Sequence, residues 1–369
     1  MSNLEPKPEE HVCNGLRDGV TDVGDQGIQL LEPRVVPLGG PRAMTVYRTL
    51  PQRAHSLVGA WCFVDSYGPD DVAQSGGMKV ARHPHTGLAT VSWLFEGRID
   101  HIDSAGNWAL VRPGEVNLMN AGTGISHSEY STADTTTLHG IQLWYAFPDK
   151  YRFTEPSLDW YRPNEIFGDG WRAKVFLGDV LGERSPVKTY IPLTGAEIRL
   201  EAGASVEIDL NSEHEHAVQQ ISGAVYVNGS AVPDDNLAFV PLGATKVTLT
   251  AGEEPVIAIF IGGEPLGEQI LMWWNFIGRT HEEIVTWRQA YQAEMGFDAP
   301  DETSPLVGRT FLDDDEALGS AISGPELDSM IAARYSDGRA FPQYGAFPPN
   351  QPDPLPAPKL PNARLKLRG

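Results

Sequence analysis

The sequence contains few cysteines and few basic residues, and it has no long apolar run. Cys13 and Cys62 are its only cysteines, too few for a disulfide framework or a thiolate metal site, which favours a reducing compartment. It has 28 Lys and Arg against 49 Asp and Glu, and the net charge of −21 repels phosphate backbones and anionic lipids. No apolar stretch reaches the ~18 residues of a membrane span, and MSNLEPKPEE shows no secretory signal. We therefore expect a soluble cytoplasmic protein that binds neither nucleic acid directly nor membranes.

Glycine and proline, in contrast, are plentiful. The 38 glycines and 29 prolines fall between β-branched and aromatic runs, as in chains of short strands joined by turns. The runs predict strands at 44–50, 90–97, 97–104, 136–147, 196–202, 205–210, 224–229 and 255–262. They form two groups, separated by a link at 153–170 that is rich in polar residues and turn formers. The length of 369 residues also suggests about two domains.

The two strand groups share a weak pattern. In each, an HxH triplet precedes a strand–glycine–strand passage (FEGRIDHIDSAG and ISGAVYVNG), and a turn with proline and glycine follows (RPGEV and PLGAT). This pattern indicates a duplicated β-barrel and an all-β fold.

One long helix and an extended tail are expected after the barrels. Thr280 and Glu283 form a capping-box pattern, and apolar residues recur at helical spacing from Ile284 to Met295. After Pro300 the chain is acidic and irregular (FLDDDEAL), and residues 342–369 hold 8 prolines. Such a tail is typical of a wrapping strap or a linker.

Histidine is concentrated in the first strand group. His83 and His85 are two residues apart in an extended segment, so their imidazoles share one face of the strand. His127 and Glu129 repeat this spacing. If the two segments are neighbouring strands with these faces inward, three imidazoles and one carboxylate converge inside a barrel. An isolated HxH is more often a surface pair, but two such pairs together favour a metal site.

The chemistry of this ligand set limits the metal. Imidazole mixed with carboxylate suits first-row divalent ions, and a set with open coordination positions is typical of Fe(II). Zinc, manganese, nickel and copper remain open.

The glycine pattern around these residues is similar to a known family. The stretch GGMKVARHPHTGLATVSWLFEG resembles the first cupin motif, except that Thr90 stands where many cupins have a glutamate ligand. The continuation HIDSAGNWALVRPGEVNLMNAGTGISHSE resembles the pirin family, in which the carboxylate comes from the HSE segment. TVYRTLPQRAHSLVGAWCFVDSYGP and EPLGEQILMWWNFIGRTHEEI extend the resemblance over about residues 40–295.

This resemblance implies two tandem cupin barrels of the jelly-roll type. It places an N-terminal extension at 1–44, a metal-binding barrel at 45–152, a second barrel without metal at 171–262, and a C-terminal helix and tail at 263–369. The implied metal is mononuclear, usually iron. Its ligands correspond to His83, His85, His127 and Glu129.

Other residues near this set have weaker assignments. His101 is expected to be a pocket residue or a neighbour of the ligands, and Asp103 and Asn107 belong to a hairpin turn. We expect core packing for Trp93, Phe95, His139 and Trp144. We expect the mouth of the barrel to be lined by Met119 and Asn120, and backbone geometry to be set by Gly114, Gly122 and Gly124.

The family resemblance implies two functions from different classes. The first is a dioxygenase acting on a flavonol-like (quercetin-type) aromatic substrate with O2, in which the metal binds an enolic oxygen and Glu129 is a ligand or a base. The second is an iron- or redox-responsive regulator that binds a transcription factor or a metabolic enzyme. A barrel with a vestigial site is the third alternative, against which the complete HxH and HxE set argues.

The second barrel carries its own triplet, His214-Glu215-His216. We expect it to bind no metal, because no later strand supplies a histidine and PLGATKV lacks any ligand residue. The surrounding NSEHEHA suggests an exposed, solvated loop.

Overall fold

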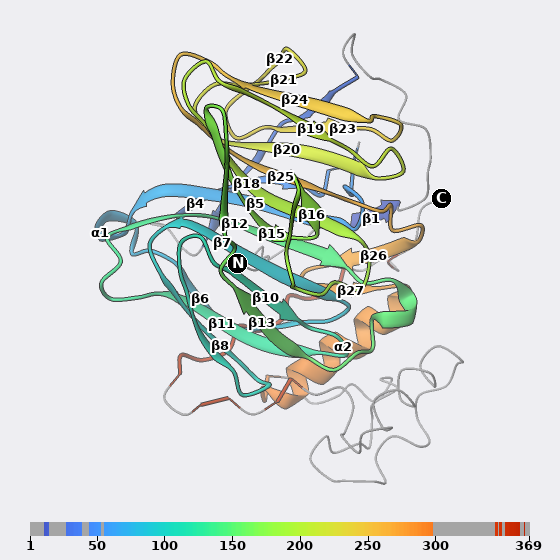
Figure 1. The fold of residues 1–369 in the computed structure, drawn as a ribbon. Coiled ribbons are helices and arrows are strands. Elements are labelled where there is room, and N and C mark those ends of the chain that lie inside the picture. The colour runs from blue at the N-terminus through green and yellow to red at the C-terminus, as the bar shows by residue number, and fades with distance from the viewer. Residues whose placement is uncertain are drawn as a thin grey trace.

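The computed structural model describes residues 11–14, 27–38, 44–52, 55–297, 344–345, 347–348, 351–361 and 365. Strands dominate, and they form two barrels stacked on each other, with one long helix at the side of the first (Figure 1). The acidic stretch FLDDDEAL lies outside the described residues.

The first barrel consists of a seven-stranded and a four-stranded sheet. The larger sheet has the order β13-β10-β7-β12-β5-β4-β3, with β3 (Arg34–Leu38), β4 (Met44–Leu50), β5 (Trp61–Asp71), β7 (Leu88–Glu96), β10 (Val116–Asn120), β12 (Thr137–Ala146) and β13 (Ser157–Tyr161). The smaller sheet has the order β6-β11-β8-β9, with β6 (Lys79–His85), β8 (Ile99–Asp103), β9 (Trp108–Val111) and β11 (Ile125–Ser131).

The second barrel also consists of a seven-stranded and a four-stranded sheet. Its larger sheet has the order β14-β15-β18-β25-β20-β23-β2, with β2 (Gln29–Leu31), β14 (Glu165–Gly168), β15 (Trp171–Leu177), β18 (Leu193–Leu200), β20 (Glu215–Ser222), β23 (Leu237–Val240) and β25 (Val256–Gly263). Its smaller sheet has the order β19-β24-β21-β22, with β19 (Ser205–Asp209), β21 (Val225–Val227), β22 (Ser230–Val232) and β24 (Lys246–Ala251).

Shorter elements complete the structure. β1 (His11–Asn14), β26 (Gln269–Trp273) and β27 (Phe276–Gly278) form a three-stranded sheet, and β16 (Asp179–Val180) pairs with β17 (Glu183–Arg184). The helical elements are α1 (Val72–Ser75), the 3-10 turn η1 (Asp149–Tyr151) and α2 (His281–Glu294). Neither helix of the described ranges is long and apolar enough to cross a bilayer.

The connectivity confirms the predicted duplication. Taken in chain order, β6 follows β5 and precedes β7 in the first barrel, just as β19 follows β18 and precedes β20 in the second. The small sheets then match strand for strand, β6-β11-β8-β9 against β19-β24-β21-β22. Each part of the first barrel therefore has a counterpart in the second.

The segment between the barrels is more ordered than the sequence suggests. The expected link at 153–170 contains β13, which pairs with β10, and β14, which pairs with β15. Each barrel thus gains an edge strand from the link. The prolines and asparagine around these strands hid the alternating pattern of SLDWY.

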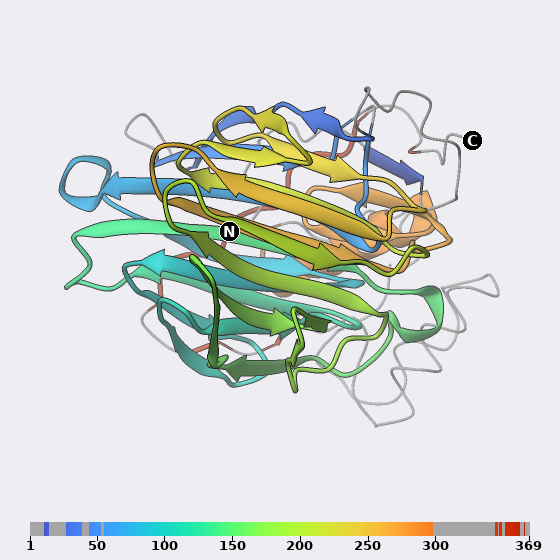
Figure 2. The ribbon, with the colours of Figure 1, turned by 45° about the horizontal axis from the view of Figure 1, so that its top comes forward.

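The main hydrophobic core lies between the two large sheets, which pack face to face (Figure 2). Trp93 is buried there, stacked on Phe176 with ring centroids 4.8 Å apart, and its Nε1 donates to Glu197 Oε2 at 2.7 Å. Trp61 Nε1 donates to the Gly262 carbonyl across the same interface at 3.0 Å. Trp93 is therefore a core residue, as expected, and it faces the second barrel.

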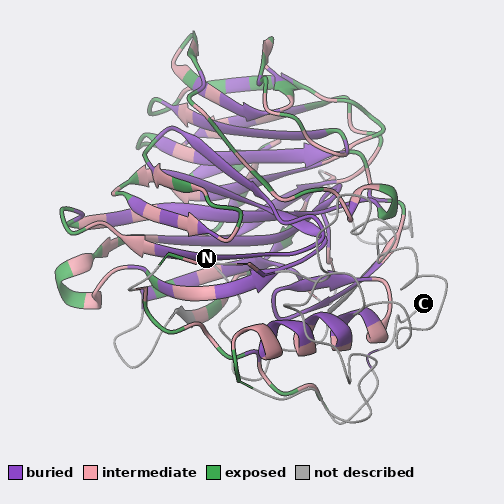
Figure 3. Ribbon diagram, turned by 90° about the horizontal axis from the view of Figure 1, so that it is seen from below, coloured by how far each residue is buried: buried purple, intermediate pink, exposed green. Residues whose placement is uncertain are grey.

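Helix α2 begins at the predicted cap. Thr280 Oγ1 accepts a hydrogen bond from the Glu283 N–H at 3.2 Å, while the Glu283 carboxylate accepts from the Arg279 N–H at 2.6 Å, one residue before the cap. The inner face of the helix buries Ile284, Trp287 and Tyr291, and its outer face is less buried (Figure 3).

The described tail residues pack against this helix as a strap. Tyr344, Ala357 and Leu365 are buried in the same cluster as Trp287. Arg288 Nε donates to the Pro358 carbonyl at 2.5 Å. The strap then reaches the edge of the first barrel, where the Leu355 N–H donates to the Arg82 carbonyl at 2.8 Å.

A partly buried histidine gives the protein an acid-sensitive contact between its barrels. The His55 ring lies 3.9 Å from that of Phe239, and burial lowers the His55 pKa from 6.5 to about 4. A lowered pKa in the folded state means that this contribution to stability is present above pH 6.5 and is lost as the pH falls towards 4.

We therefore expect His55→Phe to flatten the pH dependence of stability. Between pH 7.5 and 4.5 the wild type should lose about 2 kcal/mol more than the variant, because only the wild type must protonate this ring. Urea unfolding at both pH values measures the difference. An equal loss in both proteins would contradict the assignment to His55.

Candidate metal centre

The predicted ligands lie on one face of the small sheet of the first barrel. Strand register places His83 directly opposite His127, and Glu129 directly opposite His101. Directly paired residues share a face, as do residues two apart on a strand. The face therefore carries all four predicted ligands, with His101 beside them.

A β-bulge lies between His127 and Glu129 in the pairing of β11 with β6. Between the pairs His127–His83 and Glu129–Val80, strand β6 has one residue more than β11. Pro84 is tolerated between the two histidines because β6 is the edge strand of its sheet.

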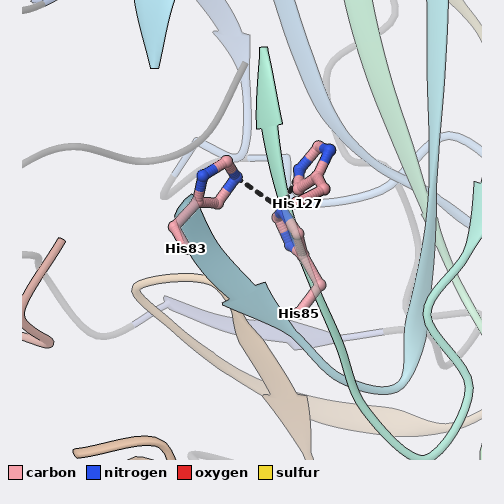
Figure 4. A group of neighbouring side chains, drawn as sticks. All are labelled: His83, His85 and His127. Atoms are coloured by element: carbon pink, nitrogen blue, oxygen red, sulfur yellow. Dashed lines mark hydrogen bonds between the residues drawn. The ribbon is translucent and has the colours of Figure 1, made fainter. Parts of the chain in front are cut away.

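Three imidazoles converge at this point (Figure 4). His83 Nε2 lies 3.1 Å from His85 Nε2, which in turn lies 3.0 Å from His127 Nε2. The three rings come from β6 and β11, and their Nε2 atoms point towards one another. His85 Nδ1 is buried, and His83 Nδ1 lies 2.8 Å from the Ala81 carbonyl.

Burial keeps these rings neutral. The side chains of His83, His85 and His127 are all fully buried, and burial lowers the pKa of His83 to about 4. Burial likewise holds the pKa of His85 and of His127 well below the usual 6.5. Neutral imidazole is the form that binds a metal, so no proton has to leave at neutral pH.

Glu129 lies in a second, overlapping group. Ligand atoms of His83, His85 and His127 lie within 4.8 Å of one another, and so do those of His101, His127 and Glu129. His127 belongs to both groups, with its Nδ1 3.4 Å from His101 Nδ1. His101, expected near the ligands, is itself a candidate ligand by position. Residues of these two groups can hold a divalent metal.

The large sheet contributes neighbours that the sequence did not reveal. Ser92 Oγ donates to Gln142 Oε1 at 2.8 Å and lies 3.5 Å from Glu129 Oε1. Tyr67, a buried residue of β5, has a pKa raised well above 10 by burial and by the nearby Glu129 charge. The only sequence signal was polar residues at inward positions of otherwise apolar strands.

Other predicted residues take structural roles. The Asp103 carboxylate accepts from the Ala105 and Asn107 N–H groups at 2.9 and 3.1 Å, which fixes the hairpin turn. Trp144 is buried, as expected, but its ring also meets that of His85 edge-on at 5.0 Å. Phe95 packs on His139 with ring centroids 4.8 Å apart, away from the candidate ligands.

The residues expected at the mouth of the barrel and the three glycines also have structural roles. Met119 packs with Ala121 and Ile125, and Asn120 Nδ2 donates to the Glu155 carbonyl at 3.0 Å and to Tyr190 at 3.1 Å. Gly122 has φ +47°, and a Cβ there would lie 1.9 Å from the Thr154 carbonyl oxygen. Gly114 and Gly124 also have positive φ, as expected of backbone-geometry residues.

The C-terminal strap touches the strand that carries two of the candidate ligands. Arg82 Nη2 donates to the Tyr344 carbonyl at 2.8 Å, and Arg82 Nε donates to Ser126 Oγ at 2.8 Å. Ser126 Oγ donates to the same Tyr344 carbonyl at 2.6 Å. Arg82 and Ser126 immediately precede His83 and His127, so the strap fastens the two ligand strands together from outside.

We expect Arg82→Met to loosen both the strap and the metal centre. The loss of charge-assisted hydrogen bonds should cost about 2 kcal/mol of stability and speed metal release to a chelator. Arg288→Met is the matched control, because it frees the strap from α2 without touching β6. Equal metal release by the two variants would show that Arg82 does not act on the ligand strands.

The second-barrel triplet is not the exposed loop that the sequence suggested. Glu215 and His216 begin strand β20, and His216 is only 3% exposed. Glu215 Oε2 accepts from the Gly59 N–H of the first barrel at 2.7 Å. The acidic, turn-forming neighbours predicted solvent exposure. The end of the triplet is instead buried, because strand β20 pairs with β23 and β25. Within the described residues, both groups of three candidate ligands lie in the first barrel.

Known proteins share this architecture and sequence. The Pirin family model matches residues 43–145, and the model of the Pirin C-terminal cupin domain matches residues 195–297. A Pseudomonas aeruginosa protein named provisionally as a quercetin 2,3-dioxygenase is 34% identical over 266 residues, 72% of this chain and 84% of that protein. Human pirin is 31% identical over 214 residues, 55% of this chain and 72% of pirin.

A solved structure extends the similarity over most of the chain. The crystal structure of quercetin 2,3-dioxygenase from Acinetobacter baumannii aligns with 93% of this chain and 99% of its own, at 30% identity and a TM-score of 0.74. The fold is thus a tandem cupin fold, as the sequence predicted. The chain belongs to the pirin family of the cupin superfamily.

Proposed function

We propose that the first barrel is a mononuclear metal centre with His83, His85, His127 and Glu129 as ligands, and that it opens a flavonol-type ring with O2. The observation that carries the proposal is the convergence of three buried, neutral imidazoles on one point. The relatives named as quercetin 2,3-dioxygenases support the substrate class.

The imidazoles lie close enough together to share one ion, with Nε2–Nε2 distances of 3.1 and 3.0 Å. Three histidines and one carboxylate would leave coordination positions open for a substrate oxygen, as in Fe(II) centres.

A divalent metal bound there would supply Lewis acidity for an enolic oxygen and a path by which electrons of the flavonol ring reach O2. The chain's own residues provide the setting. Glu129 is a buried carboxylate within reach of the candidate ligands, so it can bind the ion or accept the enolic proton. Fe(II) is our proposed ion, because a hard carboxylate beside imidazoles favours it.

The test combines metal analysis with oxygen consumption. Protein purified without added metal, and protein reconstituted anaerobically with Fe(II), should each be assayed for metal per chain and for O2 uptake with quercetin. We expect about one ion per chain and uptake that matches the loss of quercetin absorbance. Stoichiometric iron with no uptake would overturn the enzymatic proposal and favour an iron-responsive regulator.

Glu129→Gln should weaken iron retention. The amide oxygen is a poorer ligand than the carboxylate and carries no charge, so affinity should fall by at least about tenfold. Competition with a chromogenic chelator measures it, with Glu96→Gln as the control, since Glu96 is an exposed residue at the end of β7. If Glu129→Gln holds Fe(II) as tightly as the parent, Glu129 is not a ligand.

A further inference from the structure

The second barrel contains a cavity at the end that corresponds to the metal centre. In the first barrel, the candidate ligands lie where β6 ends and β7 is about to begin. The equivalent place in the second barrel is the end of β19 and the start of β20. A cavity of about 650 Å³ lies there, lined among others by Asp209, Asn211, His214, His216 and Phe260. Its size is that of a small-molecule site.

His216 makes the inner wall of this cavity polar. The side chain is 3% exposed, and its Nδ1 is buried without a hydrogen-bond partner. Its ring stacks on that of Phe260, which is 1% exposed, with centroids 5.6 Å apart and an interplanar angle of 23°. A buried polar atom normally has a partner, so this nitrogen leaves an unmet hydrogen bond in the wall of the cavity.

The cavity does not resemble a second metal site. The ring centroids of His214 and His216 are 6.3 Å apart, and no third candidate ligand joins them among the described residues. Burial lowers the pKa of His216 to about 4, so its ring is neutral. A nitrogen of a neutral imidazole can donate a hydrogen bond to a hydroxyl group or accept one from it.

The lining holds as many basic as acidic groups, with Arg184 and Lys188 against Asp179 and Asp209. Asp179 pairs with Arg184 at 3.1 Å. Asp209 lies 3.8 Å from Lys246 Nζ, which also pairs with Glu207. Lys188 also lines the cavity and is exposed, and within the described residues it has no ion-pair partner. An ammonium group at the entrance attracts a carboxylate.

We propose that this cavity binds a hydroxylated aromatic carboxylate, independently of the metal centre. The aromatic ring packs against His216 and Phe260, the ring hydroxyl hydrogen-bonds with His216 Nδ1, and the carboxylate meets Lys188 at the entrance. The site takes a ligand that is planar, anionic and about one or two rings in size.

Calorimetric titration of the full chain, treated with EDTA, tests the proposal with three probes. 4-Hydroxybenzoate should bind more tightly than benzoate, which lacks the hydroxyl, and than 4-hydroxybenzyl alcohol, which lacks the charge. Lys188→Met should weaken both carboxylates by about tenfold and leave the alcohol unchanged. Lys150→Met is the control, because Lys150 is an exposed lysine in η1, outside the lining.

His216→Phe tests the inner wall. It keeps an aromatic ring and removes the nitrogen, so 4-hydroxybenzoate should lose about tenfold in affinity while benzoate keeps its affinity. Circular dichroism checks that the barrel is folded, and Lys188→Met, an exposed position, remains informative if His216→Phe does not fold. Absence of binding to wild type at millimolar probe, or binding that neither variant changes, would overturn the proposal.

Discussion

His127→Ala should reduce bound metal from about one ion per chain to less than about a tenth, the largest functional effect of any single substitution we expect. His127 is shared by both groups of candidate ligands, with Nε2 towards His85 and Nδ1 towards His101. Replacing a residue that merely orients a ligand costs about 10- to 100-fold in metal affinity, and removing a ligand should cost more.

The fold should survive this substitution. His127 is not part of the apolar clusters, and one such cluster of the first barrel includes Tyr67, Val80, Leu94 and Leu138 and does not involve the His127 ring. Elemental analysis of the purified variant measures the metal, and circular dichroism checks the fold. His139→Ala is the matched control, because His139 is a partly buried histidine that packs on Phe95.

His83→Ala helps to locate the ion. A metal held by His83, His85 and His127 is lost in both the His83 and the His127 variants. A metal held by His101, His127 and Glu129 is lost only in the His127 variant. Wild-type metal content in both variants would show that neither group is the site.

The convergence of the candidate ligands could be predicted because its geometry is local. Two HxH-type pairs need only strand periodicity to place their side chains on one face, and the register of β6 with β11 then brings the faces together. The bulge after His127 could not be predicted, because it depends on how two distant strands pair. The same holds for Ser92 and Gln142, whose partners come from other strands.

The fold was predictable where strands alternate or are strongly apolar. Met44–Leu50 and Val256–Gly263 agree with the expected 44–50 and 255–262 almost to the residue. Several strands were missed, among them Trp61–Asp71, whose glycine and proline resemble a turn. Tertiary pairing decides such segments, since both edges of this strand pair with neighbours, β4 on one side and β12 on the other. Burial of His216 was missed for the same reason.

A buried ion pair in the first barrel gives the largest expected effect on stability. Arg48 and Asp65 are directly opposite each other on β4 and β5. Arg48 Nε donates to Asp65 Oδ1 at 2.8 Å and Nη2 to Oδ2 at 2.9 Å, while the guanidinium lies 4.3 Å from the centre of the Phe63 ring. The two residues are only 3% and 1% exposed.

Asp65→Asn should therefore destabilise the protein by about 3 to 5 kcal/mol, because it leaves the Arg48 charge buried without its counter-ion. Asp134→Asn is the matched control: Asp134 pairs with Arg98 at 2.9 Å, but both side chains are at least half exposed, so we expect a far smaller loss of stability. Calorimetric unfolding of both variants measures the difference.

The double variant Arg48→Met/Asp65→Leu separates the cost of an unpaired charge from the worth of the pair. With both charges gone, the pair itself leaves no buried charge, and apolar side chains of similar size can fill the space between Phe63 and its neighbours. We expect the double variant to recover most of the stability that Asp65→Asn loses. If instead it is as unstable as the single variant, the ion pair itself stabilises the barrel. The stability lost in Asp65→Asn then does not come from leaving the Arg48 charge without Asp65.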